Sequence, residues 1–165
     1  MDIHSLIAKV KTLQGSRVSP PGELPSLEEG YTLPADLKQF YETCGGLTLF
    51  QDSDYTVHIV PPEEFVPANP VIVGERAEYD ISSHWFIVAK EDNGDYLTID
   101  LSRERSGRCY ASFWDTHGQP GECPIIAGSF TDLLARLIGN GGGRWYWLRD
   151  DFVSLGDAYD GVDVT

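Results

Sequence analysis

The stretch KEDNGDYLTID, residues 90–100, gathers carboxylates around a glycine, a pattern that calcium loops and acid–base catalysts both use. A helix–loop–helix calcium site needs a glycine at its sixth position and an oxygen ligand at its first. Placing Gly94 sixth puts Ala89 first, and alanine carries no ligand. Catalytic carboxylates must face one space, whereas Asp92 and Asp95 flank a tight turn without a neighbouring histidine. We therefore expect a β-hairpin here, with both central turn residues at positive φ.

The other residues that could perform catalysis or bind a metal are scattered. The histidines are His4, His58, His84 and His117, and none has a second ligand at metal-binding spacing. The cysteines are Cys44, Cys109 and Cys123, an odd number without a C-x-x-C pair. They indicate free buried thiols in a reducing compartment. GNGGGR at 139–144 follows a helix and lacks the lysine of a phosphate loop, and no G-x-S-x-G occurs. We expect no catalytic, metal or cofactor site, and hence no enzyme.

The charge of the chain limits its partners. Twelve Lys and Arg stand against 26 Asp and Glu, which gives a net charge of −14. Such a surface repels phosphate backbones and anionic membranes, so we expect neither nucleic-acid nor membrane binding. It attracts a basic partner; the alternative is that acidity serves solubility alone. No apolar run is long enough to span a membrane, and residues 1–15 show no secretory signal, which indicates a cytoplasmic location.

The sequence predicts three helices. Apolar residues at helical spacing predict an N-terminal helix over 2–14. A second helix opens with Pro34 in its first turn and ends at two glycines, one of them in a left-handed cap. A third is capped by Ser129 and terminated by Gly139 and Asn140. A single helical turn is expected in PPEEFVP, residues 61–67.

Consecutive strands are expected between the second and third helices, over 47–50, 56–60, 84–91, 95–101 and 109–114. The strand at 84–91 is apolar throughout and should be buried on both faces, whereas 95–101 alternates and should be half-buried. This order predicts one α+β domain over 1–165: a mainly antiparallel sheet with helices packed on one face or end.

Two segments have no clear periodicity. Residues 16–32 are rich in Pro, Gly and Glu and indicate an irregular arm. The aromatic and acidic segment 143–165 could add a strand to the sheet edge, exchange with another copy or be disordered. We expect its start to be docked, because leaving Trp145, Tyr146 and Trp147 in water would be unusual.

Four stretches resemble, in the family's order, the motifs of the SUKH superfamily. They are LPADLKQFYETCGGLTLF at 33–50, HIVPPEEF at 58–65, WFIVAKEDNGDYLTIDL at 85–101 and IAGSFTDLLARLI at 126–138. The resemblance covers about residues 30–140. The superfamily includes the yeast cell-wall synthesis regulator and many bacterial immunity proteins that neutralise secreted polymorphic toxins. It implies a single α+β domain that binds a protein and catalyses nothing.

Most residues that carry the resemblance are expected to be structural. They are Leu33, Pro34, Phe40, Gly45, Gly46, Phe65, Trp85, Gly94, Asp95, Asp100 and Phe130. We expect Phe40, Trp85 and Phe130 to fill the core, and Asp95 to hydrogen-bond its own turn.

The favoured function is a bacterial immunity protein that holds a cognate toxin by direct contact. The alternatives are a regulator or scaffold with a cellular partner, and an enzyme with an unrecognised site. Toxins that cut nucleic acid carry basic clefts, which an acidic surface can occupy. The partner-binding residues expected are Asp52, Asp54, Glu63, Glu64, Glu91 and Asp92, with Tyr55 as aromatic anchor. We expect a monomer or a weak homodimer.

Overall fold

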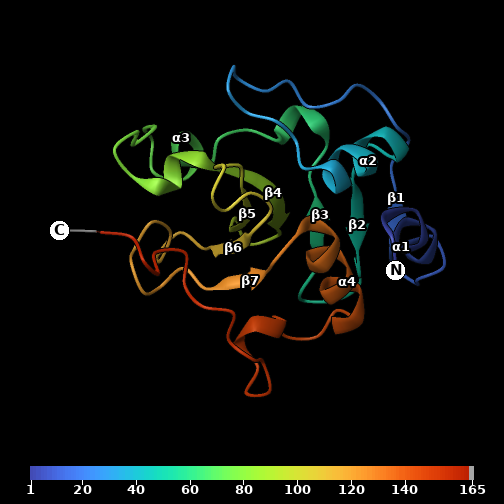
Figure 1. The fold of residues 1–165 in the computed structure, drawn as a ribbon. Helices are drawn as coiled ribbons and strands as arrows, with labels where there is room; N and C mark the ends of the chain where they lie inside the picture. The colour runs from blue at the N-terminus through green and yellow to red at the C-terminus, as the bar shows by residue number, and fades with distance from the viewer. Residues whose placement is uncertain (164–165) are drawn as a thin grey trace.

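The computed structural model describes residues 1–163, which form an antiparallel meander of seven strands with most of the helices gathered beside the first three strands (Figure 1). The strands are β1 (Arg17–Val18), β2 (Leu47–Leu49), β3 (Val57–Ile59), β4 (Trp85–Glu91), β5 (Tyr96–Asp100), β6 (Cys109–Ser112) and β7 (Ile125–Ala127). The helices are α1 (Ile3–Val10), α2 (Ala35–Thr43), α3 (Ala68–Ile72) and α4 (Phe130–Asn140). Short 3₁₀ turns are η1 (Pro62–Glu64), η2 (Ile81–His84) and η3 (Tyr146–Leu148). Each strand pairs with its neighbour in sequence, which confirms the predicted α+β fold.

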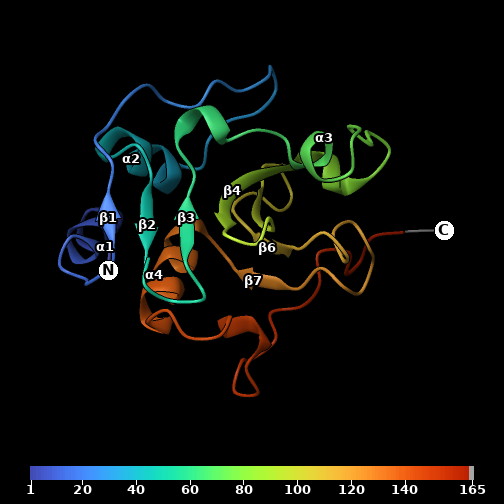
Figure 2. The same ribbon diagram turned by 180° about the vertical axis from the view of Figure 1, so that it is seen from behind.

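The main core lies between the sheet and helices α1, α2 and α4, and Figure 2 shows β1–β3 in front of α4. Phe40 of α2 and Phe130 of α4 meet edge to face at 4.8 Å between ring centroids, and both are fully buried. A buried side chain of this size stabilises the fold by about 1.5–3 kcal/mol. The predicted core roles of Phe40 and Phe130 are confirmed.

The helix ends differ slightly from the predicted ones. Ser129 caps α4 as expected, accepting a hydrogen bond from the Asp132 amide at 3.0 Å. The helix ends at Asn140 as predicted, but its left-handed cap is Gly141, with φ of 65°, and the predicted terminators Gly139 and Asn140 are still helical. Helix α1 ends at Val10, not near residue 14.

The paired glycines after α2 allow the proline-rich arm to approach the sheet. A Cβ on Gly45 would lie 2.4 Å from the Pro20 carbonyl oxygen, so no side chain fits there. The predicted left-handed cap is displaced, because the capping residue Cys44 is extended and positive φ falls on Gly46, at 110°. The paired glycines thus serve a close approach of two backbone segments.

The predicted hairpin between β4 and β5 is confirmed, but its turn is of another kind. Within the turn only Gly94 has positive φ, at 96°, so Asn93 does not adopt the predicted conformation. The Glu91 carboxylate accepts the Asp95 amide at 2.6 Å. Asp95 thus bonds its own turn through its backbone amide, whereas its carboxylate accepts the Trp114 amide at 2.8 Å.

The second face of the sheet carries a smaller cluster of buried side chains: Trp85, Tyr110, Cys123, Ile125, Ala158 and Tyr159. The prediction that β5 is half-buried was therefore wrong, since Thr98 and Asp100 are fully enclosed. The segment after Gly156 covers this face, where the Ala158 amide donates to the Cys123 carbonyl at 2.9 Å. Trp85 fills this second cluster and not the main core.

Asp100 remains a satisfied buried carboxylate. Its Oδ2 accepts from the Tyr110 hydroxyl at 2.6 Å, and its Oδ1 accepts from the Ser102 amide at 2.9 Å. Two donors on one carboxylate offset the cost of removing it from water.

The start of the C-terminal arm is docked, as predicted. Trp145, just before η3, and Tyr146 and Trp147 within it are buried, and the two indoles stack with centroids 5.4 Å apart. The Tyr146 hydroxyl donates to the Ile126 carbonyl of β7. The last two residues of the arm predicted over 143–165 lie outside the described residues.

Candidate partner-binding surface

Four of the predicted partner-binding carboxylates lie at one end of β3. Asp52 and Asp54 are exposed in the turn between β2 and β3, at the lower end of these strands in Figure 2. Glu91 and Asp92 lie at the same end, because Glu91 pairs with Val57, the first residue of β3. Residues that are separate in sequence are thus brought to one edge of the molecule by the antiparallel register.

The remaining two carboxylates, Glu63 and Glu64, lie in η1 beyond the opposite end of β3. The Glu64 carboxylate accepts from Lys90 Nζ at 2.7 Å, and Asp92 accepts from His58 Nε2 at 2.7 Å. Both pairs are partly solvated, so each contributes less than about 1 kcal/mol. The six carboxylates therefore do not form a continuous patch, and three of them, Glu64, Glu91 and Asp92, already have partners within the chain.

Tyr55, the predicted aromatic anchor, is largely engaged within the chain. Its ring meets Trp145 edge to face at 5.1 Å between centroids. Two residues earlier, the Ser53 hydroxyl donates a hydrogen bond to the Gly142 carbonyl, which ties the same turn to the C-terminal arm. Tyr55 thus helps to fasten that arm and is only half-exposed.

Trp114 is the aromatic side chain that sequence reasoning missed. It is 76% exposed, although its amide is held by the Asp95 carboxylate of the β4–β5 turn. Exposed Asp92 in that turn and Asp115 beside Trp114 place negative charge near the indole. An exposed indole on a fixed backbone is the kind of group that anchors protein interfaces. The sequence contained no signal for this exposure, because Trp114 ends a segment that otherwise reads as buried strand.

A hydroxyl, an imidazole and a carboxylate are hydrogen-bonded in series across the sheet, an order of groups that also occurs in catalytic triads. Thr48 Oγ1 lies 2.9 Å from His58 Nδ1, and His58 Nε2 bonds Asp92. Thr48 is only 5% exposed and sits between β1 and β3, paired with Arg17 and His58. A nucleophile must reach its substrate, which the buried Thr48 hydroxyl does not do. These hydrogen bonds therefore serve to hold Asp92 in place.

A second polar network lies next to the smaller cluster, where His117 packs against Trp85. His117 Nε2 is 2.6 Å from Asn69 Oδ1, and Asn69 Nδ2 donates to Ser82 Oγ at 3.0 Å. Asp80 accepts from the hydroxyls of Ser82 and Tyr159. Burial lowers the pKa of His117 to about 4, so its imidazole is neutral at pH 7. Asn69 separates the imidazole from the serine, and the network joins α3, η2 and the C-terminal segment without a nucleophile–base pair.

The protonation of the buried thiols and the placement of the acidic groups bear on redox and metal chemistry. Burial raises the pKa of Cys44, and raises that of Cys123 to about 11, which keeps both as unreactive thiols. Within residues 1–163, no group of three or more His, Cys, Asp or Glu is placed to hold a metal ion. The described chain also has no helix long and apolar enough to cross a membrane.

Comparison with known proteins gives a family match and a relative. The model of the SMI1 / KNR4 family (SUKH-1) matches residues 26–136. The chain is 52% identical over 164 residues to a protein of Bacillus subtilis (strain 168) named Immunity protein YokJ. That alignment covers 99% of both chains. No solved structure matches the chain.

Proposed function

This chain belongs to the SMI1 / KNR4 family (SUKH-1), and from that premise we propose that it is an immunity protein that neutralises a cognate toxin by direct binding. The observation that carries the proposal is the 52% identity to a protein named as an immunity protein, over 99% of both chains. The alignment spans nearly the whole of both chains, so the similarity is not confined to the stretch matched by the family model.

The chemistry of the surface supports a basic protein as partner. The net charge of −14 favours rapid encounter with a positively charged face. Exposed Asp52 and Asp54 at one end of β3, with Asp92 and Trp114 across the β4–β5 turn, combine charge with an aromatic anchor. We propose that these groups contact the toxin and that Glu64 acts mainly within the chain.

We infer that the protein blocks its partner without chemical conversion. The Thr48 hydroxyl is buried in the sheet and His117 lacks an adjacent nucleophile, so neither network is arranged as a catalyst. As part of the same proposal, the protein acts in the cytoplasm as a monomer or weak homodimer.

The test is rescue and binding with the toxin domain encoded by the neighbouring reading frame. The domain is expressed with and without this chain, and the pair is titrated by calorimetry at low and high salt. Rescue with tight binding is the expected result, and absence of both would refute the proposal for that toxin. If the affinity is the same at low and high salt, the immunity role stands, but the proposal that acidic groups make the contact is refuted.

A charge-reversal pair locates the contact. Replacing Asp52, Asp54 and Asp92 by lysine should slow association about tenfold or more and reduce its salt dependence. The matched control replaces three exposed carboxylates elsewhere: Glu23, Glu29 and Glu42. Both variants change the net charge equally, so equal on-rates in the two would show that only overall charge matters.

A further inference from the structure

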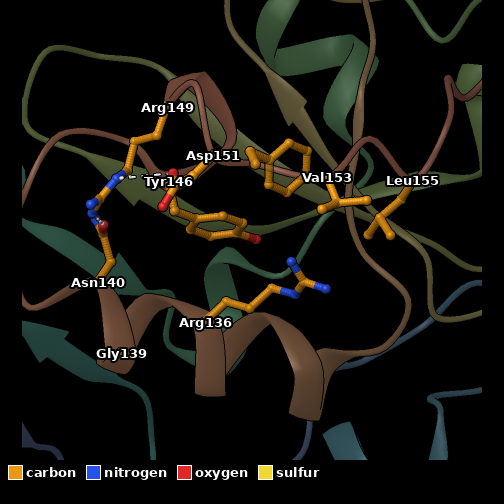
Figure 3. Close-up of a pocket in the computed structure, with 9 residues that line it drawn as sticks. Arg136, Gly139, Asn140, Tyr146, Arg149, Asp151, Val153 and Leu155 are labelled. Atoms are coloured by element: carbon orange, nitrogen blue, oxygen red, sulfur yellow. Dashed lines mark hydrogen bonds and ion pairs between the residues drawn. The ribbon is translucent and has the colours of Figure 1, made fainter.

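A hollow of about 560 Å³ lies between α4 and the chain that follows η3 (Figure 3). Its lining combines two arginines with exposed aliphatic side chains, an unusual mixture in a chain with 12 basic and 26 acidic residues. Each arginine is paired with an aspartate, Arg136 with Asp132 and Arg149 with Asp151, so the hollow differs from the acidic surface in offering guanidinium donors.

Arg136 forms the floor of the hollow. Its guanidinium carbon lies 5.9 Å from the ring centroids of both Tyr146 and Phe152, and its Nε donates to Asp132 at 3.0 Å. Among the described residues, the Arg136 side chain makes no other hydrogen bond, so its two terminal nitrogens keep their donors. A guanidinium held from behind is prepared to bind a carboxylate with two parallel hydrogen bonds.

Arg149, the second arginine, is already engaged. It donates to Asn140 Oδ1 at 3.3 Å and lies 3.5 Å from the Asp151 carboxylate. Figure 3 shows these three side chains together at one side of the hollow, apart from the Arg136 guanidinium. Arg136 therefore keeps both terminal nitrogens for an incoming anion, whereas Arg149 uses one of them on Asn140.

The rim beside Arg136 is aliphatic. Val153 is 78% exposed and Leu155 is 39% exposed, and Figure 3 shows both near the guanidinium. Exposed aliphatic groups beside free guanidinium donors suit a ligand that carries an apolar group next to its anion. Because Val153 stands so far in solvent, the hollow is open, which suits a protein loop better than an enclosed small molecule.

We propose that this hollow receives a carboxylate side chain and a neighbouring aliphatic side chain from the protein partner, with Arg136 binding the carboxylate. This rests on the proposed function, because the partner is the toxin. It adds a contact of reversed polarity, which would fix the orientation of a complex otherwise driven by acidic groups on this chain.

The experiment measures toxin affinity by calorimetry for two hollow variants, Arg136→Gln and Val153→Asp. Each should weaken binding about 30-fold or more, as expected for anchor residues. Val153→Asp places a competing carboxylate beside Arg136, and its exposed position protects the fold. Thermal unfolding checks that Arg136→Gln, which also loses the Asp132 bond, remains folded.

The controls are Arg144→Gln and Val71→Asp, made at exposed positions outside the hollow. Arg144→Gln removes one positive charge and should leave binding to a basic toxin unchanged or tighter. Affinities of both hollow variants within about twofold of the wild type would overturn the inference while leaving the proposed function intact. If the wild type itself fails to bind, the proposed function fails, and the inference with it.

Discussion

Acidification should destabilise this protein through His117, a buried imidazole that favours its neutral form. The side chain is 6% exposed. Asn69 Nδ2 donates to two oxygens, so Asn69 Oδ1 is an acceptor and His117 Nε2 carries the proton. Nδ1 has no hydrogen-bond partner among the described residues. Protonation would add a charge and an unpaired donor to this site, opposed only by the nearby Asp80 carboxylate.

The expected size follows from the pKa. Burial lowers the pKa of His117 from 6.5 to about 4. Between these values the unfolded chain binds a proton that the native chain does not, so stability falls as the pH falls through this window. The loss from His117 is about 1.4 kcal/mol between pH 7.5 and pH 5.5, and about 3 kcal/mol once the pH is below 4.

Urea unfolding at pH 7.5 and 5.5 measures this loss. A difference of about 1.4 kcal/mol moves the urea midpoint by about half a molar to one molar. His117→Gln keeps a donor for Asn69 but cannot titrate, so this variant should lose about 1.4 kcal/mol less than the wild type over the same interval. His4→Gln, which removes an exposed imidazole and leaves His117 in place, should retain the wild-type loss.

Equal losses in the wild type and in His117→Gln would refute the reasoning. That result would mean that the imidazole is protonated in the native state near its ordinary pKa, and that the site is more hydrated than its burial indicates.

Three further substitutions test the packing and the surface. Trp114→Ala should change the free energy of unfolding by less than about 0.5 kcal/mol but weaken toxin binding about 30-fold, measured by urea unfolding and calorimetry. Tyr110→Phe should cost about 1.5–3 kcal/mol in urea unfolding, because the buried Asp100 carboxylate loses its hydroxyl donor. Gly45→Ala should cost on the order of 1–3 kcal/mol in the same assay, because its Cβ would clash with the Pro20 carbonyl.

Each of these has a matched control in the chain. Tyr79→Ala removes another exposed aromatic and should leave toxin affinity unchanged; an equal loss would contradict the role of Trp114. Tyr96→Phe removes a hydroxyl that does not contact the buried Asp100 carboxylate, and should lower the free energy of unfolding by less than Tyr110→Phe does. Gly22 lies in the proline-rich arm that Gly45 approaches, and it has open space around it. A cost of Gly22→Ala equal to that of Gly45→Ala would therefore argue against the clash.

The elements that sequence reasoning found are those whose signals are local. Helix α4 carries five apolar residues at helical spacing behind a serine cap, and the β4–β5 hairpin carries an apolar strand before a glycine turn. Strands β1 and β7 and helix α3 were missed, because segments of two to five residues are too short to show a period. Their pairing is decided by neighbours distant in sequence.

The candidate surface was only partly predictable for the same reason. Composition predicted an acidic partner surface, and Asp52, Asp54 and Asp92 are exposed as expected. The pairing of Glu64 with Lys90 depends on cross-strand register, in which Lys90 lies opposite His58 on the neighbouring strand. No rule of spacing connects η1 with the C-terminal end of β4.

By itself the sequence determined the acidic charge, the main helices, the central hairpin and the family motifs, all of which depend on residue type and short-range order. Tertiary structure alone decided that Asp100 is buried, that Trp114 is left in solvent and that Arg136 faces a hollow. The physical reason is that burial and free hydrogen-bonding capacity depend on which distant segments cover a side chain. Here those segments are the C-terminal arm and the loops around β6, which have no periodic pattern to announce where they dock.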